Sequence, residues 1–447
     1  MFVKNQKFLL LGVSKSGFSA ASHILDKGGK CYLYEELSDP KITEGINALI
    51  SRGAVNVTNG VDSILPVIDA VVISPGIPIN HEIAVKAKRL GIRIIGEFSL
   101  GYFECTPTFI AVTGTNGKTT TVNLIANIFK AAYDDVRLVG NVGVPITKCL
   151  NDITSDTVFV AEVSSFQLES VDYFCPHIAC VLNVSPDHLE RHYTMENYVF
   201  LKKRILSNLT QTEYAVLNYD DETVRMFADC IKAKTIWISA SEKVDGAYLE
   251  EGKLFYKDEF IIKESDIPIA GLHNVYNTLF SIACAKISGI ETDKIVLGIK
   301  SFKGVRHRLE LVAESGGVKY YDDSKATNTA STLSAIKNMK SETVLILGGS
   351  EKGENYDKLF ETIKNSLIKH VVLTGASKFN MLKSASACNY SDITITFDFK
   401  NAVKIASLMA NNGDCVLLSP ACASFDSFSN YEERGEVFAE TIREITC

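Results

Sequence analysis

Short apolar runs alternate along the chain with segments of helical periodicity. The run KFLLL (residues 7–11) passes through a glycine-containing turn into an amphipathic stretch, and KCYLY (30–34) starts the next apolar run. Apolar runs closed by glycine or polar residues predict buried strands, and the 3.6-residue periodicity between them predicts helices. The chain is therefore expected to be an α/β protein built on largely parallel sheets.

The α/β pattern restarts twice, near IAVTGTNGKTT (110–120) and near SFKGVRHRLELV (301–312). A chain of 447 residues is too long for one ordinary hydrophobic core. We expect three domains, with a Rossmann-like domain at each end and an α/β domain in the centre. Their predicted boundaries are 1–97, 98–303 and 304–447. Within the central domain, AYLEEGKLFYKDEFIIK predicts a patch of antiparallel strands.

Composition and charge exclude several protein classes. The formal net charge of −7 argues against a nucleic-acid partner. The apolar run near the N-terminus is too short for a membrane span or a signal peptide, so a cytoplasmic protein without a membrane partner is expected. Eleven cysteines contain no CxxC pair and are expected to be buried, reduced thiols.

The stretch IAVTGTNGKTT predicts a phosphate-binding loop. A strand that leads through glycine to Lys-Thr-Thr at a helix start supplies backbone N–H groups, a helix dipole, an ammonium and hydroxyls. These groups fit the β- and γ-phosphates of a nucleotide with Mg²⁺, which makes the centre a P-loop-like ATPase domain. The standard P-loop spacing is not met, because its first glycine would fall on Val112, and a tight turn without a ligand stays open. The predicted cradle is Gly114, Thr115, Asn116, Gly117, Lys118, Thr119 and Thr120.

A second glycine pattern, GVSKSG (12–17), follows the first predicted strand. Ser14 replaces the second glycine of G-x-G-x-x-G, and its side chain disfavours the close approach of a dinucleotide pyrophosphate. Glu35, at the end of the next strand, is placed to accept a hydrogen bond from a ribose or a uracil. A structural turn with no ligand is the alternative.

Acidic and imidazole side chains follow two predicted strands of the centre. Glu162 ends a buried strand, where a carboxylate is costly unless it is paired or bound to a metal. Asp187 and His188 follow another strand, and together these groups suit Mg²⁺. Zinc on His188 and His192 would require a glutamate where Leu189 stands. A capping role for His188 stays open.

Polar groups also gather after the strands of the third domain. Asp323, Lys325 and Thr327 stand just before a predicted helix, Lys352 follows another strand, and the segment 419–435 adds hydroxyls. Lysines beside helix N-termini at the carboxyl ends of parallel strands suit a small dianion. Either lysine taken alone could instead be a solvated surface residue.

Taken together, these motifs resemble those of the Mur ligases, in particular the branch that uses D-glutamate. The matching segments are TGTNGKTT, EVSSFQLE, NVSPDHLERH, GLHNVYN, HRLE, DDSKATN, LGGSEKG and SPACASFDSFSNYEERG, with SPGIP and GNVGVP in addition. The resemblance implies a monomeric, ATP-dependent ligase of peptidoglycan precursor synthesis that joins D-glutamate to UDP-N-acetylmuramoyl-L-alanine. The γ-phosphoryl group of ATP would pass to the carboxylate, and the amine of D-glutamate would attack the acyl phosphate after hinge closure.

The resemblance also implies a set of site residues. Those for catalysis are Lys118, Glu162, His188 and Lys202. Two Mg²⁺ ions would be held by Thr119, Glu162, His188 and Lys202, the last as a carbamate, with Lys203 the adjacent alternative. ATP would also contact Asn274, Asn277, Arg308 and Asp323. The UDP substrate would contact Lys15, Ser16, Glu35, Ser74, Gly76, Asn141 and Ser164. D-Glutamate would contact Lys325, Thr327, Lys352, Ser424, Phe425 and Tyr431.

Three other functions stay open from the sequence. A folylpolyglutamate synthase would share the chemistry but lacks a first domain of this kind and the SPACASFDSF element. A NAD-dependent dehydrogenase would explain the first domain alone. A non-catalytic nucleotide-binding module would leave the buried acidic and imidazole groups without a role.

Overall fold

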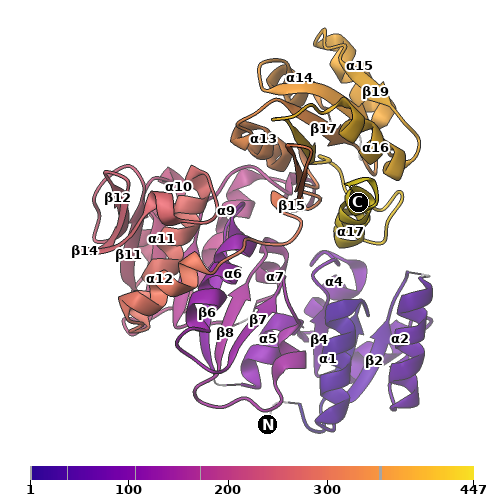
Figure 1. Cartoon of the computed structure of the whole chain (residues 1–447). Coiled ribbons are helices and arrows are strands. Elements are labelled where there is room, and N and C mark those ends of the chain that lie inside the picture. The colour runs from indigo at the N-terminus through magenta and orange to yellow at the C-terminus, as the bar shows by residue number, and fades with distance from the viewer. Residues whose placement is uncertain (1–2, 38, 106, 172, 352–354, 447) are drawn as a thin grey trace. The chain divides into compact units, whose positions relative to one another are not determined.

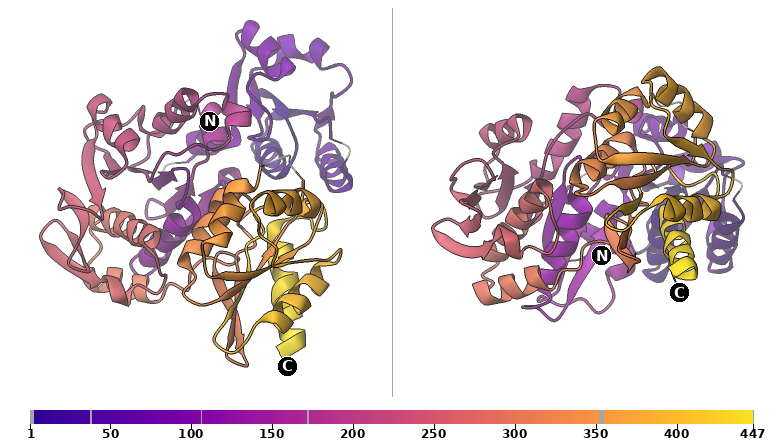
Figure 2. Two further views of the ribbon diagram at one scale, coloured as in Figure 1. Left: turned by 90° about the horizontal axis from the view of Figure 1, so that it is seen from above. Right: turned by 45° about the horizontal axis from the view of Figure 1, so that its top comes forward.

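The computed structural model describes residues 3–37, 39–105, 107–171, 173–351 and 355–446 (Figure 1). The chain divides into two compact units, Met1–Lys303 and Gly304–Cys447. The first unit contains two sheets and the second contains one, each with helices on its faces (Figure 2). The predicted α/β class is confirmed.

The first sheet has five parallel strands in the order β3-β2-β1-β4-β5. Its strands are β1 (Lys7–Leu11), β2 (Lys30–Tyr34), β3 (Val55–Asn56), β4 (Ala70–Ile73) and β5 (Arg93–Gly96). The helices of this part are α1 (Lys15–Asp26), α2 (Pro40–Ser51), α3 (Val61–Ile64), α4 (Glu82–Arg89) and α5 (Glu97–Phe103). The strand order reverses between β1 and β4, so a ligand cleft is expected beyond the carboxyl ends of these two strands.

The second sheet has nine strands in the order β14-β13-β12-β11-β10-β9-β6-β8-β7. They are β6 (Thr108–Thr113), β7 (Val136–Gly140), β8 (Val158–Glu162), β9 (Ile178–Val181), β10 (Tyr214–Asn218), β11 (Lys234–Ser239), β12 (Gly246–Glu250), β13 (Lys253–Tyr256) and β14 (Glu259–Lys263). Only the β12–β13 and β13–β14 pairs among them are antiparallel. The predicted antiparallel patch is therefore confirmed.

Helices of different lengths accompany the second sheet. The helices are α6 (Lys118–Phe129), α7 (Ser165–Glu169), α8 (Leu189–His192), α9 (Met195–Lys203), α10 (Glu222–Arg225), α11 (Leu272–Ile287) and α12 (Thr292–Lys300). Helices α11 and α12 both pack against α6, which begins at the glycine-rich loop. The buried residues of α6 include Val122, Leu124 and Ile125, so its apolar face anchors that loop in the core.

The sheet of the second unit has six strands in the order β15-β16-β20-β17-β18-β19. They are β15 (Glu310–Ser315), β16 (Val318–Asp322), β17 (Thr343–Leu347), β18 (Ile368–Leu373), β19 (Ile393–Ile395) and β20 (Cys415–Leu418). One face packs against α13 (Thr329–Asn338), α14 (Asp357–Lys364) and α15 (Lys378–Ala387). The other packs against α16 (Phe399–Met409) and α17 (Tyr431–Thr446). Alternate residues of β17 and β20 point into the two cores, as parallel strands buried on both faces require.

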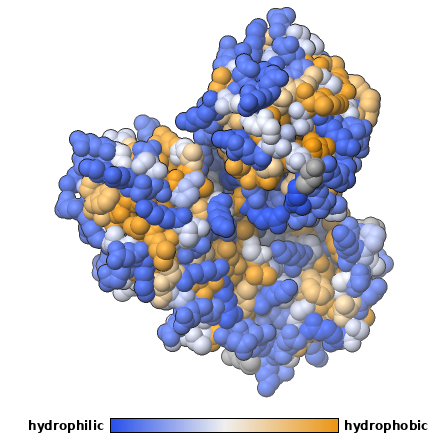
Figure 3. All heavy atoms as spheres, viewed as in Figure 1, coloured by the Kyte–Doolittle hydropathy of each residue, from blue (hydrophilic) through white to orange (hydrophobic). Residues whose placement is uncertain are grey.

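Hydrophilic residues cover most of the face shown in Figure 3, with apolar residues in patches among them. Among the residues described, no helix has the length and apolar character needed to cross a membrane.

Glu97, the first residue of α5, is a buried carboxyl in the first unit, with 3% of its surface exposed. It accepts hydrogen bonds from the backbone N–H and the hydroxyl of Thr147, at 2.7 and 2.8 Å. Burial raises the pKa of Glu97 from 4.5 to about 7, and the two hydrogen bonds oppose that rise. The native state therefore keeps a proton that the unfolded chain releases at lower pH.

We expect this carboxyl to make the first unit less stable as pH rises from about 4.5 to 7, because the unfolded state ionises first. Glu97→Gln keeps an acceptor oxygen but does not ionise. The variant should match the wild type near pH 4, below the unfolded pKa, and exceed its free energy of unfolding by roughly 3 kcal/mol at pH 8. Urea unfolding measures this difference in free energy. The fluorescence of Trp237, the single tryptophan, reports on it because Trp237 lies in the first unit, as Glu97 does. The exposed Glu242→Gln is the control, and parallel pH curves for wild type and Glu97→Gln would contradict the assignment.

Candidate active site

The glycine-rich loop runs from the carboxyl end of β6 to the start of α6. Gly117 is the N-cap of α6 and has a φ of 84°, a left-handed conformation that favours glycine. A Cβ atom on Gly117 would lie 2.6 Å from the Asn277 Oδ1 atom. The backbone thus approaches α11 closely, and the N–H groups of the first turn of α6 give the helix an end that attracts anions.

Asn183, which follows β9, braces this loop. Its Oδ1 atom accepts hydrogen bonds from the backbone N–H groups of Thr115 and Asn116, at 3.1 and 2.9 Å. Its side-chain amide donates to the Asn116 carbonyl at 3.1 Å. The sequence analysis missed this residue. The available signal was a polar side chain at the end of a strand next to β6, where parallel strands place their functional groups.

Two lysine ammonium groups meet at the carbonyl of Gly114. Lys118 donates to the carbonyls of Gly114 and Thr115 at 2.9 and 2.8 Å, and Lys202 donates to that of Gly114 at 2.7 Å. Lys202 is 1% exposed and lies 4.5 Å from the centre of the Tyr198 ring. Burial, and secondly the charge of Lys118, hold the pKa of Lys202 well below its ordinary value. The direction of this shift favours the neutral amine.

Glu162, at the end of β8, provides a buried carboxylate beside the loop. It is 2% exposed, and its Oε1 atom accepts from the Asn141 side-chain amide at 2.7 Å. Its Oε2 atom is buried and has no hydrogen-bond partner among the residues described, and the same is true of the Thr113 hydroxyl at the end of the neighbouring strand β6. Buried oxygens without a partner are costly unless a cation or water satisfies them, so this position fits a hard cation such as Mg²⁺.

His188 precedes α8 and has a left-handed φ of 54°. Its imidazole lies 3.5 Å from both an Asp187 and a Glu190 carboxylate oxygen, and its ring packs 4.8 Å from that of Phe166. His188 is the N-cap residue of α8, but in the part of the chain that the structure describes its side chain makes no capping hydrogen bond, so the imidazole itself does not cap the helix. The partly exposed ring stays available as a ligand.

His192 differs from His188 in being buried and held by other side chains. Its Nε2 atom lies 2.9 Å from the Ser165 hydroxyl, and its Nδ1 atom lies 3.2 Å from a Glu169 oxygen. Burial lowers the pKa of His192, which favours the neutral ring. These contacts give His192 a structural role in supporting α7 and α8.

The predicted adenine-side residues lie on α11, next to the loop. Asn277 is buried, accepts from the Thr121 hydroxyl at 3.0 Å and donates to Asn274 Oδ1 at 3.0 Å. Asn274 in turn donates to the Ala270 carbonyl at 2.8 Å. The structure therefore brings Asn277 directly to the helix start at Gly117, with Asn274 one turn earlier. The predicted metal-side hydroxyls, Thr119 and Thr120, are buried in the first turn of α6.

The residues predicted for the uridine end gather at the carboxyl ends of β1, β2 and β4. The Ser74 hydroxyl donates to the Gly12 carbonyl at 2.8 Å. Glu35 accepts from the backbone N–H groups of Val13 and Leu37, at 2.7 and 3.0 Å. Both side chains thus shape the turn that follows β1. Lys15 and Ser16 start α1 beside them.

The remaining predicted UDP-side residues connect to the central sheet. Lys15 donates to the Gly143 carbonyl at 3.0 Å, near Asn141, and Ser164 caps α7 by accepting from the Gln167 backbone N–H. A further residue, Arg191, was missed by the sequence analysis. It donates to the Gly76 and Ile77 carbonyls at 3.2 and 2.9 Å, and it pairs with Glu169 at 2.6 Å. An arginine within NVSPDHLERH gave no signal of this distant contact.

In the second unit, Asp323 and Arg308 lie close in sequence to the start of the sheet. Asp323 is buried and accepts from the Ser419 hydroxyl at 2.7 Å. Burial raises the pKa of Asp323 to about 7, partly opposed by that hydrogen bond and by Arg308. The Arg308 Nε atom is buried without a hydrogen-bond partner among the described residues. The residues predicted for ATP therefore come from both units.

The residues predicted for D-glutamate lie on loops after β16 and β20 and on α17. The Lys325 ammonium lies 5.2 Å from the centre of the Tyr431 ring. Thr327 donates its backbone N–H to the Lys325 carbonyl, Ser424 is buried, and Phe425 is 73% exposed. Lys352 lies outside the described residues. The others share one end of the second-unit sheet.

Another group of possible metal ligands is present in the second unit. Atoms of His307, Glu310 and Asp322 lie within 4.8 Å of one another. The His307 Nδ1 atom is 2.7 Å from Asp322, and Glu310 accepts from the His307 backbone N–H at 2.7 Å. These groups satisfy one another, so we interpret them as a structural network.

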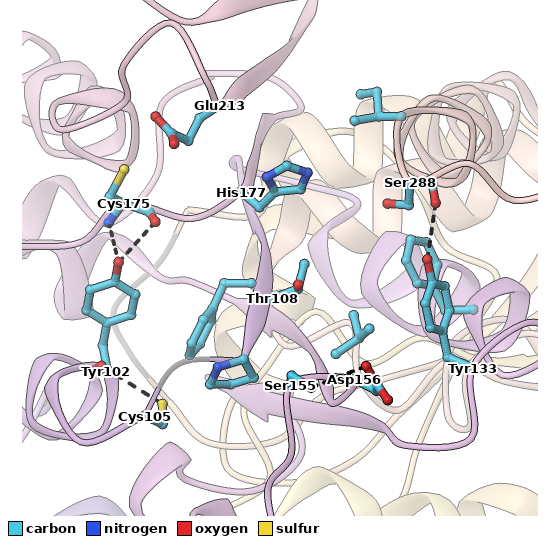
Figure 4. Close-up of a pocket in the computed structure, with 15 residues that line it drawn as sticks. Tyr102, Cys105, Thr108, Tyr133, Ser155, Asp156, Cys175, His177, Glu213 and Ser288 are labelled. Atoms are coloured by element: carbon cyan, nitrogen blue, oxygen red, sulfur yellow. Dashed lines mark hydrogen bonds between the residues drawn. The ribbon is translucent and has the colours of Figure 1, made fainter.

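A cavity lies at the opposite edge of the central sheet from the glycine-rich loop (Figure 4). It measures about 630 Å³ and opens at the amino ends of β6, β8 and β9. Side chains that line it include Tyr102, Thr108, Tyr133, His177 and Glu213. It contains none of the residues predicted for phosphate, metal or substrate, so the cavity does not mark the candidate site.

Three family comparisons cover most of the chain. The Mur ligase MurD-like N-terminal domain matches residues 6–96, the Mur ligase middle domain matches 112–285, and the Mur ligase glutamate ligase domain matches 307–422.

Curated relatives match from end to end. A UDP-N-acetylmuramoylalanine–D-glutamate ligase of Clostridioides difficile (strain 630) is 40% identical over 457 residues, covering 100% of both chains. The protein of that name from Caldicellulosiruptor bescii is 38% identical and covers 100% of this chain and 99% of its own. Among solved structures, the MurF ligase of Thermotoga maritima in complex with ADP superposes with a TM-score of 0.61 at 18% identity, covering 99% and 96% of the two chains.

Proposed function

Because the chain belongs to the Mur ligase family, we propose that it catalyses the ATP-dependent addition of D-glutamate to UDP-N-acetylmuramoyl-L-alanine. Relatives named for this reaction match the chain over its full length. The observation that carries the chemistry is the buried Glu162 Oε2 atom, which has no hydrogen-bond partner in the described part of the chain and lies beside a loop on which Lys118 and Lys202 converge. This arrangement supports phosphoryl transfer with Mg²⁺ in the cytoplasmic stage of peptidoglycan precursor synthesis.

The three predicted domains divide the substrates between them in this proposal. Residues 1–97 bind the UDP end, residues 98–303 bind ATP, and residues 304–447 bind D-glutamate. The strand-order reversal in the first sheet supports the first assignment, since ligands bind at such points. The glycine-rich loop before α6 supports the second, because a helix N-terminus attracts phosphate.

Within the centre, the chain's own groups position the phosphates and the acceptor carboxylate. Lys118 and the N–H groups of the first turn of α6 hold the β- and γ-phosphates. Thr119 and Glu162 would hold one Mg²⁺, and His188 with a carbamylated Lys202 would hold a second. When bound, the two ions neutralise charge that develops on the transferring phosphoryl group. Phosphorylation turns the poorly electrophilic L-alanyl carboxylate into an acyl phosphate, which the amine of D-glutamate attacks with release of phosphate.

The burial of Lys202 supports its proposed carbamylation. A neutral amine adds to CO₂ and releases one proton, which turns the side chain into an anion, and the lowered pKa of Lys202 favours that neutral amine. We expect Lys202→Ala to lose at least about 100-fold of the activity and to recover part of it with formate or acetate. The adjacent, partly exposed Lys203 is the matched control, and Lys203→Ala should keep near-normal activity.

Carbon-13 NMR under ¹³CO₂ tests the same point without turnover. A carbamate signal should be present in the wild type and in Lys203→Ala, and absent in Lys202→Ala. Full activity of Lys202→Ala without added carboxylate would discard the role.

The proposed function is tested by ADP release with UDP-N-acetylmuramoyl-L-alanine and a panel of amino acids. We expect release that depends on D-glutamate and is weak with L-glutamate, D-alanine or diaminopimelate. Release with tetrahydrofolate and L-glutamate would favour a folylpolyglutamate synthase instead. No release with any pair would reject a ligase of this kind.

A further inference from the structure

Arg434 is a buried arginine on the first turn of α17. It is 1% exposed and is the largest of the fully buried side chains. A buried guanidinium is costly unless its donors are satisfied, so the groups around it show what it does.

The donors of Arg434 reach two loops that follow different strands. Its Nε atom donates to the Ser324 hydroxyl at 2.9 Å, and its Nη2 atom donates to the Ser324 carbonyl at 2.8 Å, after β16. Nη2 also donates to the Cys422 carbonyl at 3.0 Å, and Nη1 donates to the Ala423 carbonyl at 3.3 Å, after β20. One planar side chain therefore fixes the spacing between the two loops.

A third loop, after β17, packs against the same group. A Cβ atom on Gly349 would lie 3.0 Å from the Arg434 Nη1 atom and 2.2 Å from the Ala423 carbonyl oxygen. The Ser350 backbone N–H donates to the Ala423 carbonyl at 2.8 Å. The ends of β16, β17 and β20, which are neighbours in the sheet, thus meet around one guanidinium.

The acceptors of Arg434 are all uncharged. Within the described ranges, its hydrogen bonds go to carbonyls and one hydroxyl, and it forms no ion pair. Burial lowers the pKa of Arg434 to about 10, which leaves it charged near neutral pH. Its contacts are therefore suited to holding backbone in place.

We infer that Arg434 is a positioning residue for the amino-acid substrate, which holds the loop of Lys325 and the loop of Ser424 at the separation that the substrate needs. The inference rests on the proposed function, because it takes these loops as the D-glutamate site. Arg434 does not touch the substrate in this account. It acts through Ser324, the residue before Lys325, and through Ala423, the residue before Ser424.

Steady-state kinetics with two substitutions test the inference. Arg434→Lys keeps the positive charge but loses the planar set of guanidinium N–H donors. We expect the KM for D-glutamate to rise by about tenfold while the KM for ATP stays within about twofold of the wild-type value. Arg434→Ala should raise the KM for D-glutamate further. Millimolar methylguanidinium should lower that value again by about threefold, because it restores the planar donors.

Arg443→Ala is the matched control, since Arg443 is exposed on the same helix. It should behave as the wild type with and without methylguanidinium. Ser324→Ala removes the hydroxyl that accepts from Arg434 and donates to the Tyr431 carbonyl at 2.8 Å, and it remains informative if the arginine variants do not fold. We expect it to raise the KM for D-glutamate by about threefold.

The wild type in the same assay tests the proposed function separately from the positioning role of Arg434. If it does not use D-glutamate, the proposed function fails, whatever the variants do. If it does, equal changes in the KM values for D-glutamate and ATP, or no change in Arg434→Lys and Ser324→Ala, would overturn the role of Arg434. A selective rise with rescue by methylguanidinium supports it.

Discussion

Replacing Lys118 by methionine is expected to lower kcat by about 10³-fold, the scale of losing one preorganised charge at a transferring phosphoryl group. The ammonium of Lys118 lies at the start of α6 and contacts the carbonyls of Gly114 and Thr115. Methionine keeps most of the side-chain volume but removes the charge. The loop should stay in place, because Asn183 holds Thr115 and Asn116.

The same change has a second expected effect. The charge of Lys118 contributes to lowering the pKa of Lys202, so its removal should raise that pKa and reduce carbamylation. ADP release and the ¹³C carbamate signal should therefore both decrease in Lys118→Met. Lys130→Met, at the exposed C-terminal end of the same helix, is the control. Near-normal ADP release by Lys118→Met would reject the phosphate-binding role of the loop.

Glu162→Gln is expected to lower Mg²⁺-dependent turnover by about 10³-fold without destabilising the fold. Glutamine keeps the acceptor for Asn141 but replaces a buried charged group by a neutral one. The buried Oε2 atom has no partner in the described residues, and removal of its charge relieves a desolvation cost. The free energy of unfolding without metal should therefore stay equal or rise by about 1–2 kcal/mol.

Two measurements separate these outcomes. Urea unfolding without metal should place Glu162→Gln at or above the wild type, and added Mg²⁺ with ATP should stabilise only the wild type appreciably. Glu169→Gln provides a contrast, because Glu169 is paired with Arg191 and its substitution should destabilise the first unit. Retained activity in Glu162→Gln, or a strong loss of stability, would contradict the metal-ligand assignment.

Local patterns were sufficient to predict much of the fold. Apolar runs ending in glycine located β1, β6 and β17, and the short strand-like runs within residues 247–263 located the antiparallel strands. The turn before α6 was recognisable because Gly117 requires a left-handed φ next to a lysine. Such features depend on a few consecutive residues, which is why the sequence carries them.

Groups that act over long sequence distances were not predictable. Asn183 contacts a loop 67 residues away, and Arg434 contacts a serine 110 residues away. Their partners are mostly backbone atoms, which leave no residue-specific pattern. The supporting contacts of Ser74 and Glu35 were likewise invisible, and their predicted roles at the uridine end stay predictions. A sequence motif gives the groups that meet a ligand more readily than those that hold the motif together.

The short approach between Gly117 and Asn277 limits how the two positions can evolve. A side chain at residue 117 would collide with the amide 2.6 Å away and would also require an unfavourable φ of 84°. A smaller residue at 277 would relieve the collision but would also remove the acceptor for Thr121. Substitutions that keep the protein folded should therefore occur at both positions together. An alignment of diverged homologues should show residues 117 and 277 either both unchanged or both altered.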